Sequence, residues 1–170
     1  MDCSCIKLKD GSNIPVLALG TYRAQGEPLA IAIRTAINCG YRHFDTAQAY
    51  LNEDILGDEL RECINESNGK LKRKDFYLVS KIWCTNHSRD RVKESFAETL
   101  KKLKVDYLDL LLIHWPMGFK ETGAELFPKN ADGKLEASEI SFIETYKAME
   151  ELVREGKVKS IGVSNFNMQQ

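Results

Sequence analysis

Short apolar runs alternate with longer amphipathic stretches along most of this chain. Five runs have the length and the apolar content of buried strands, at residues 16–20, 42–45, 76–81, 107–114 and 159–164. The fourth is apolar at nearly every position from Leu108 to Ile113, as expected of a strand covered on both faces. Strands that alternate with helices in this way predict right-handed βαβ units and a parallel sheet.

Four stretches between these runs place apolar residues at helical spacing. The first begins at Pro28, which is favoured in a first turn, and ends before Gly40, where a glycine commonly closes a helix. The second runs from about Asn52, the third follows Ser88 as its N-cap, and the fourth ends before Gly156. The side chains that we expect to face the sheet are Leu29, Ile33, Ala36, Ile37, Ile55, Leu56, Leu60, Ile64, Val92, Phe96, Leu100, Leu103, Ile140, Ile143, Met149 and Leu152.

Two segments fall outside this alternation. Near the N-terminus, Ile6 and Leu8 alternate with lysines before a turn at Asp10-Gly11, which predicts a β-hairpin. Residues 117–138 are rich in Gly, Lys, Glu and Asn and have no clear period. A loop of this length inside a compact domain is usually functional or mobile. Because it follows a strand that ends at His114, it should overhang that strand end.

The composition narrows the class of protein. The chain has 170 residues, of which 43% are hydrophobic and 29% charged, and this predicts one packed domain rather than a disordered or collagen-like chain. Its net charge of -1 argues against a nucleic-acid or membrane-surface partner held by charge. No apolar run approaches the roughly 18 residues of a membrane span. Without a signal-peptide pattern, we expect a cytoplasmic protein with reduced cysteines and no metal site.

Four of the five predicted strands end in polar side chains, which are Asp45, Lys81, His114 and the pair Ser164-Asn165. Tyr50 follows Asp45 by five positions. The carboxyl ends of parallel strands meet at one edge of a sheet or barrel, so we expect these groups to converge. Each alone fits an ordinary structural role, such as a turn cap, a solvated lysine or a buried histidine. Their joint occurrence on successive strand ends indicates a site.

These groups suit protonation of a carbonyl oxygen. A free tyrosine has a pKa of about 10 and is a weak acid at neutral pH, but an adjacent ammonium such as Lys81 should lower the pKa of Tyr50. Asp45 would hold Lys81 in place, and His114 would position the carbonyl. General acid help from Tyr50 is typically worth about 10²–10⁴-fold in rate. The hydride must come from a cofactor, because no side chain can supply it.

Four motifs, in order, resemble those of the aldo-keto reductase family, whose members are NADP-dependent (β/α)8 TIM-type barrels. The first reads Gly-Tyr-Arg-His-Phe-Asp-Thr-Ala at 40–47, followed by Tyr50, Asn52-Glu53 and Gly57. The others are Lys81-Ile82-Trp83, His114-Trp115-Pro116 and Ile161-Gly162-Val163-Ser164-Asn165-Phe166. The match extends from about Ile6 to Phe166.

The resemblance implies NADPH-dependent reduction of aldehydes and ketones, with Tyr50 as general acid. The implied catalytic residues are Asp45, Tyr50, Lys81 and His114. The implied cofactor-binding residues are Asp45, Thr21 and Tyr22 beside the nicotinamide, and Ser164 and Asn165 on its carboxamide. The implied substrate-binding residues are Tyr22, Tyr50, Trp83, His114 and Trp115. Ordinary packing beneath the long loop is the alternative for both tryptophans, and Tyr22 stands where many members carry tryptophan.

The resemblance also implies that residues 1–170 form a partial aldo-keto reductase domain, with an N-terminal hairpin and about five βα units of the α/β barrel. The later strands and the loop that grips the cofactor phosphates in this family have no counterpart here, and no GxGxxG loop replaces them. The alternatives are a truncated, non-catalytic product that acts through protein–protein contacts at its open barrel edges, and a structural, crystallin-like role. The particular carbonyl substrate, the choice of NADP over NAD and the oligomeric state stay open.

Overall fold

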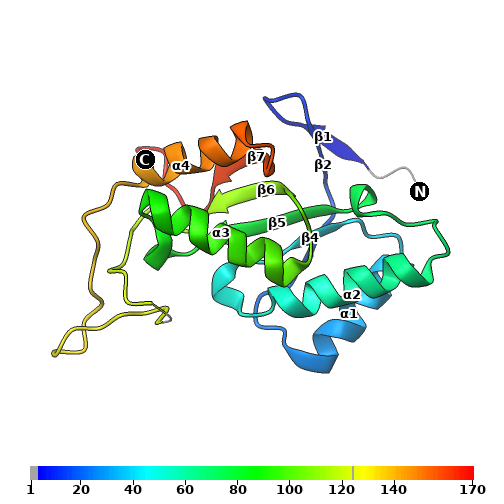
Figure 1. The fold of residues 1–170 in the computed structure, drawn as a ribbon, viewed down its shortest axis with the longest axis horizontal. Coiled ribbons are helices and arrows are strands. Elements are labelled where there is room, and N and C mark those ends of the chain that lie inside the picture. The colour runs from blue at the N-terminus through cyan, green and yellow to red at the C-terminus, as the bar shows by residue number, and fades with distance from the viewer. Residues whose placement is uncertain (1–3, 124) are drawn as a thin grey trace.

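The computed structural model describes residues 4–123 and 125–170 (Figure 1). Its centre is a five-stranded parallel sheet in the order β3-β4-β5-β6-β7. These strands are Leu19–Gly20, His43–Asp45, Tyr77–Ile82, Leu108–Ile113 and Val158–Val163. Every strand therefore pairs with the next one along the chain, and the predicted parallel sheet is confirmed.

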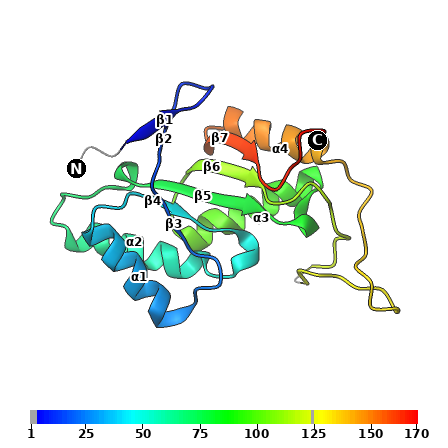
Figure 2. The same cartoon turned by 180° about the vertical axis from the view of Figure 1, so that it is seen from behind.

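In the described residues, the strands of the sheet are connected by four α-helices: α1 (Gly26–Asn38), α2 (Glu53–Glu66), α3 (Arg89–Leu103) and α4 (Phe142–Arg154). They pack on one face of the sheet, so that Figure 2, seen from behind, presents β5 to β7 with no helix in front. The core between the two layers contains most of the predicted side chains, including Leu29, Ile33, Leu56, Phe96 and Met149. Burial of these apolar side chains is the main favourable contribution to the stability of the layered fold.

Several predicted boundaries were wrong. α1 begins at Gly26 rather than Pro28, so the proline lies inside the first turn. Of the strand predicted at 16–20, only Leu19–Gly20 pairs in the sheet. Ile143, predicted to face inward, is 54% exposed, because the buried face of α4 is formed by Thr145, Ala148, Met149 and Leu152, and Ile143 lies off that face. Ile140 precedes the helix.

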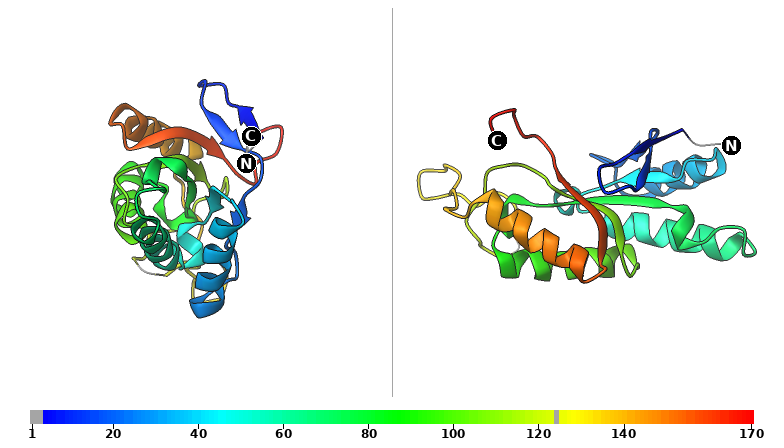
Figure 3. Two further views of the ribbon diagram at one scale, coloured as in Figure 1. Left: turned by 90° about the vertical axis from the view of Figure 1, so that its right-hand side faces the viewer. Right: turned by 90° about the horizontal axis from the view of Figure 1, so that it is seen from above.

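The predicted hairpin is confirmed as β1 (Cys5–Lys7) paired antiparallel with β2 (Asn13–Pro15). It lies beside β7 (Figure 3). Ser160 of β7 donates a hydrogen bond to Asp10 and contacts the hydroxyl of Ser12 at 3.0 Å between the two oxygens. These bonds join the start of the chain to its last strand.

Among the described residues between β6 and α4 there is no helix and no extended strand, as the sequence predicted for 117–138. The segment folds back on itself through two isolated bridges, Phe119 with Ala137 and Lys129 with Leu135. It hangs beyond the carboxyl ends of the strands (Figure 1). None of the helices in the described part of the chain is long and apolar enough to cross a membrane.

Gly57 allows α2 and α3 to approach closely. A Cβ at this position would lie 2.5 Å from the carbonyl oxygen of Lys102 and 2.7 Å from the Cα of Leu103. We expect Gly57→Ala to lower the free energy of unfolding by about 2 kcal/mol, because two backbones must move apart and this outweighs the better helix propensity of alanine. Urea denaturation should show no comparable loss for Gly20→Ala, where the new Cβ meets nothing within 4 Å. Equal stability of the two variants would contradict the prediction.

Candidate active site

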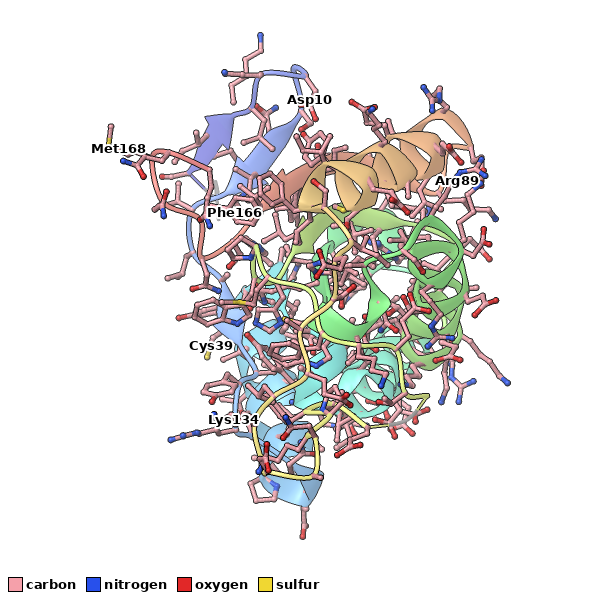
Figure 4. All side chains as sticks on the ribbon, turned by 90° about the vertical axis from the view of Figure 1, so that its left-hand side faces the viewer. Asp10, Cys39, Arg89, Lys134, Phe166 and Met168 are labelled. Carbon is pink, nitrogen blue, oxygen red and sulfur yellow. The ribbon has the colours of Figure 1, made fainter. Side chains whose placement is uncertain are left out.

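Four predicted site residues meet at the carboxyl ends of neighbouring strands. Asp45 ends β4, Lys81 is the penultimate residue of β5, and His114 directly follows β6. Tyr50 ends a short 3₁₀ helix, η1 (Gln48–Tyr50), that follows β4. Figure 4 views this end of the sheet, where the segment that carries the labelled Lys134 crosses in front.

Lys81 lies at the centre of this group and is 6% exposed. Its Nζ donates to Oδ1 of Asp45 at 2.7 Å and to the carbonyl oxygen of Thr46 at 2.8 Å. The same nitrogen is 3.4 Å from the hydroxyl oxygen of Tyr50. The lysine thus bridges the carboxylate and the phenol.

Aromatic contacts place His114 against the same phenol. The ring centroids of Tyr50 and His114 are 5.5 Å apart, and the rings meet edge to face. On its other side His114 contacts Trp83, with centroids 5.2 Å apart. Nδ1 of His114 is buried without a hydrogen-bond partner. The imidazole is therefore held mainly by ring packing.

The pKa of Tyr50 departs from the sequence-based expectation. Burial, with a smaller effect from the Asp45 carboxylate, raises the pKa of Tyr50 to about 12. The prediction of a lowered pKa was wrong for this structure, because burial desolvates the phenolate and the Asp45 carboxylate repels it. Burial also lowers the pKa of Lys81, while the Asp45 carboxylate opposes that shift. Burial and the nearby Lys81 lower the pKa of His114 to about 4, so its imidazole is neutral at pH 7.

The residues predicted to bind the cofactor differ in how accessible their side chains are to a ligand. Asn165 adopts a left-handed backbone conformation (φ 62°), and its Nδ2 donates to the carbonyl oxygen of His114 at 2.8 Å and to Oγ of Ser164 at 3.1 Å. This ties the end of β7 to the end of β6. Tyr22 is 63% exposed, and its ring lies 5.1 Å from that of Tyr50. Thr21 is fully buried, with its hydroxyl bonded to Asp45 and Asn52, so its side chain presents no surface to a ligand.

The two predicted tryptophans also differ. Trp83 is 6% exposed, and its indole Nε1 donates to the carbonyl oxygen of Leu126 at 2.8 Å. Trp115 is 38% exposed. Sequence reasoning missed Phe119 and Phe127, whose rings pack against Trp83 with centroids 6.2 Å and 5.3 Å away. Their place in an aperiodic loop concealed them, although aromatic residues in a polar segment were a usable signal.

His87 lies beneath the start of the same loop, and its ring is buried with no partner for either nitrogen. Burial lowers its pKa to about 4. The pKa of a histidine in the unfolded chain is about 6.5, so between these values only the unfolded state takes up the proton. We therefore expect the free energy of unfolding to fall as the pH drops from about 6.5 to 4.

The variant His87→Leu should show a shallower fall than the parent chain when urea denaturation is repeated across this range. Carboxylates titrate equally in both proteins, so the difference isolates this one histidine. Identical pH profiles would contradict the assignment. In the described parts of the chain, no three His, Cys, Asp or Glu side chains gather as a metal site.

Parallel βα units with an aspartate, tyrosine, lysine and histidine at their carboxyl ends define a protein of the (β/α)-barrel class. Within that class, the sequence model of the Aldo/keto reductase family matches residues 16–170. The chain belongs to the aldo-keto reductase family, and its homologues are oxidoreductases.

Individual relatives agree with this assignment. Aldo-keto reductase family 1 member A1 of Gallus gallus is 44% identical over 168 residues, which are 99% of this chain and 51% of that protein. An uncharacterized oxidoreductase of Schizosaccharomyces pombe is 48% identical over 160 residues, which are 94% of this chain and 48% of that protein. The chain thus spans about half the length of these curated relatives.

A solved structure supports the fold. The aldose reductase from Schistosoma japonicum matches with a TM-score of 0.93 and 42% sequence identity, and the match covers 98% of this chain and 55% of that one. The prediction of a hairpin followed by five strands of a (β/α) barrel is thereby confirmed.

Proposed function

We propose that this chain carries the catalytic residues for NADPH-dependent reduction of aldehydes and ketones to alcohols, with Tyr50 as the general acid. The observation that carries the proposal is the continuous array in which Lys81 contacts both Asp45 and the hydroxyl of Tyr50, 3.4 Å from its Nζ. His114 borders the same hydroxyl-bearing ring. A proton donor (Tyr50) thus lies in contact with both a cation (Lys81) and a neutral imidazole (His114).

The roles of the side chains follow from their charges. A neutral His114 can donate one N–H to a carbonyl oxygen and so hold it near the phenol of Tyr50. Tyr50 then gives its hydroxyl proton to that oxygen as negative charge develops there. The ammonium of Lys81, beside the phenol oxygen, stabilises the phenolate that remains, and Asp45 fixes the ammonium.

The donor set at the end of β7 fits a nicotinamide carboxamide. Asn165 offers its amide oxygen as an acceptor, and Ser164 offers a hydroxyl. The exposed ring of Tyr22 beside Tyr50 offers an aromatic surface for a planar ring. When bound, the cofactor supplies the hydride that the side chains lack. The choice of NADP over NAD rests on the family resemblance.

The proposal is tested by mixing the purified chain with NADPH and an aromatic aldehyde and following NADPH oxidation and alcohol formation together. We expect equal amounts of NADPH consumed and alcohol formed, and slower turnover with NADH. Reactions without aldehyde provide the blank. No turnover from soluble, folded protein, shown by circular dichroism to retain its helices, would contradict the proposal.

A second candidate function is binding without catalysis. β3 and β7 are the two edge strands of the described parallel sheet, and a groove of about 710 Å³ lies along β7. Its lining includes Leu112, Ile161 and Val163, and Val163 is 46% exposed. Apolar strand edges favour association with another strand. Self-association in analytical ultracentrifugation, with a poorly cooperative thermal transition, favours this function, and a sharp monomeric transition counts against it.

A further inference from the structure

We infer that Asn52 is a positioning residue of the candidate site. Its buried side-chain amide joins the loop that carries Tyr22 to Thr46 at the end of β4, and the carbonyl oxygen of Thr46 accepts a hydrogen bond from Lys81. The inference rests on the proposed function for its effect on turnover. Its geometric part, which concerns the surroundings of Lys81, can be measured without turnover.

The amide of Asn52 makes its hydrogen bonds inside the protein. Its side chain is fully buried. Nδ2 donates to the carbonyl oxygens of Thr21 and Ala24, each at 2.9 Å. Oδ1 accepts from the hydroxyl of Thr46 at 2.8 Å. It also lies 3.4 Å from the hydroxyl of Thr21, whose one proton is shared with the carbonyl oxygen of Asp45 at 3.1 Å. Both donors and one acceptor position of the amide are thus fully occupied.

The hydrogen bonds of Asn52 differ from those that an asparagine usually makes at this position of a helix. It is the residue immediately before α2, where an asparagine usually caps the helix with its side-chain oxygen. Asn52 makes no such bond to the helix. The amide is turned instead toward the loop after β3 and the end of β4. Helix capping therefore does not account for the side chain.

Two of the partners of Asn52, Thr46 and Thr21, lead directly to the site. The carbonyl oxygen of Thr46 accepts a hydrogen bond from Lys81 at 2.8 Å. The backbone N–H and the hydroxyl of Thr21 both donate to the carbonyl oxygen of Asp45, at 3.0 Å and 3.1 Å. Holding Thr46 and Thr21 together thus fixes the backbone on both sides of the ion pair between Lys81 and Asp45.

The same contacts hold the loop that bears Tyr22. The bonds from Asn52 to Thr21 and Ala24 bracket Tyr22 on both sides. Its ring packs on that of Tyr50. Small displacements of reacting groups cost about 10²-fold in rate, so a side chain that fixes both elements contributes through geometry alone.

The test uses Asn52→Ser, which keeps a helix-capping oxygen but loses both amide donors. Thr46→Val is the milder variant, since it removes one bond to Asn52 and leaves the Thr46 carbonyl for Lys81. Leu60→Ala is the control, because Leu60 is a buried residue of α2 outside the site. The readouts are the pKa of Lys81, from ¹³Cε NMR of labelled lysines, and kcat and KM for the aldehyde. Lys81→Met identifies the lysine signal.

We expect Asn52→Ser to raise the pKa of Lys81 toward about 10.4, the ordinary lysine value, because loosened loops admit water to the ammonium. The variant should lower kcat about 10–100-fold with a smaller change in KM. Thr46→Val should show the same directions more weakly. Leu60→Ala should lower the unfolding midpoint and move neither readout.

An unchanged pKa of Lys81 in folded Asn52→Ser would overturn the inference in favour of simple capping. An equal shift in Leu60→Ala would overturn it in favour of a general loss of stability. If Asn52→Ser does not fold, the result for Thr46→Val decides in the same way. If no protein turns over the aldehyde, the proposed function fails, and the pKa of Lys81 alone decides the role of Asn52.

Discussion

Replacing Tyr50 with phenylalanine should lower kcat for carbonyl reduction by about 10²–10⁴-fold, because the variant keeps the ring and loses only the proton donor. The ring contacts with Tyr22 and His114 need no hydroxyl, so the packing of the site should persist. KM should change little, since the phenol acts mainly on the transition state. NADPH oxidation in steady state measures both constants.

Tyr146→Phe is the matched control, since this tyrosine lies on α4, packs against the core and lines the groove along β7 rather than the group around Lys81. The pH profile provides a further check on the unaltered chain. With the pKa of Tyr50 raised to about 12, the acid form persists, and kcat should stay flat from about pH 6 to 9. Activity lost equally in both phenylalanine variants would remove Tyr50 from the mechanism.

Asp109→Ala should lower the free energy of unfolding by about 3–5 kcal/mol, more than Gly57→Ala. Asp109 is 3% exposed. Its Oδ2 accepts from Arg73 at 2.9 Å and from the backbone N–H of Leu78 at 3.0 Å, and its Oδ1 accepts from Lys159 at 2.8 Å. Removing the carboxylate leaves the buried N–H of Leu78 without its acceptor. The partly buried guanidinium of Arg73 loses its counter-charge and keeps the carbonyl oxygens of Phe76 and Tyr107 as acceptors.

Urea denaturation at pH 7 measures this loss against Asp132→Ala, which removes an exposed carboxylate in the loop and should cost less than about 0.5 kcal/mol. A loss below about 1 kcal/mol for Asp109→Ala would mean that water replaces the carboxylate. It would also show that the ion pairs around this strand are dispensable for folding.

The sequence predicted the elements and the meeting of four site residues because strand order along the chain decides which strand ends lie together. Asp45, Lys81 and His114 lie at the carboxyl ends of successive strands, so their meeting follows from the strand order alone. Asp109 was visible as a lone charge in an apolar run. Its partners were not predictable, since Arg73 and Lys159 are 36 and 50 residues away.

Energetic details were less predictable than positions. The direction of the pKa shift of Tyr50 depends on the balance between burial and a nearby ammonium, and burial is a property of the folded chain. Thr21 and Asn52 were visible as motif residues, but their orientation follows from loop geometry. Ile143 is spaced by three positions from Ile140 but by six from Met149, so it does not share the buried face of α4 and is exposed to solvent.

The strand order also has a consequence for biosynthesis. Each strand of the sheet pairs with its immediate predecessor, so a nascent chain can add one βα unit at a time as it leaves the ribosome. The bonds between the hairpin and β7 join Asp10 and Ser12 to Ser160, 148 to 150 residues later. They can form only after β7 is made. The hairpin β1–β2 is thus translated before the sheet, but it can dock on β7 only after that strand has been made.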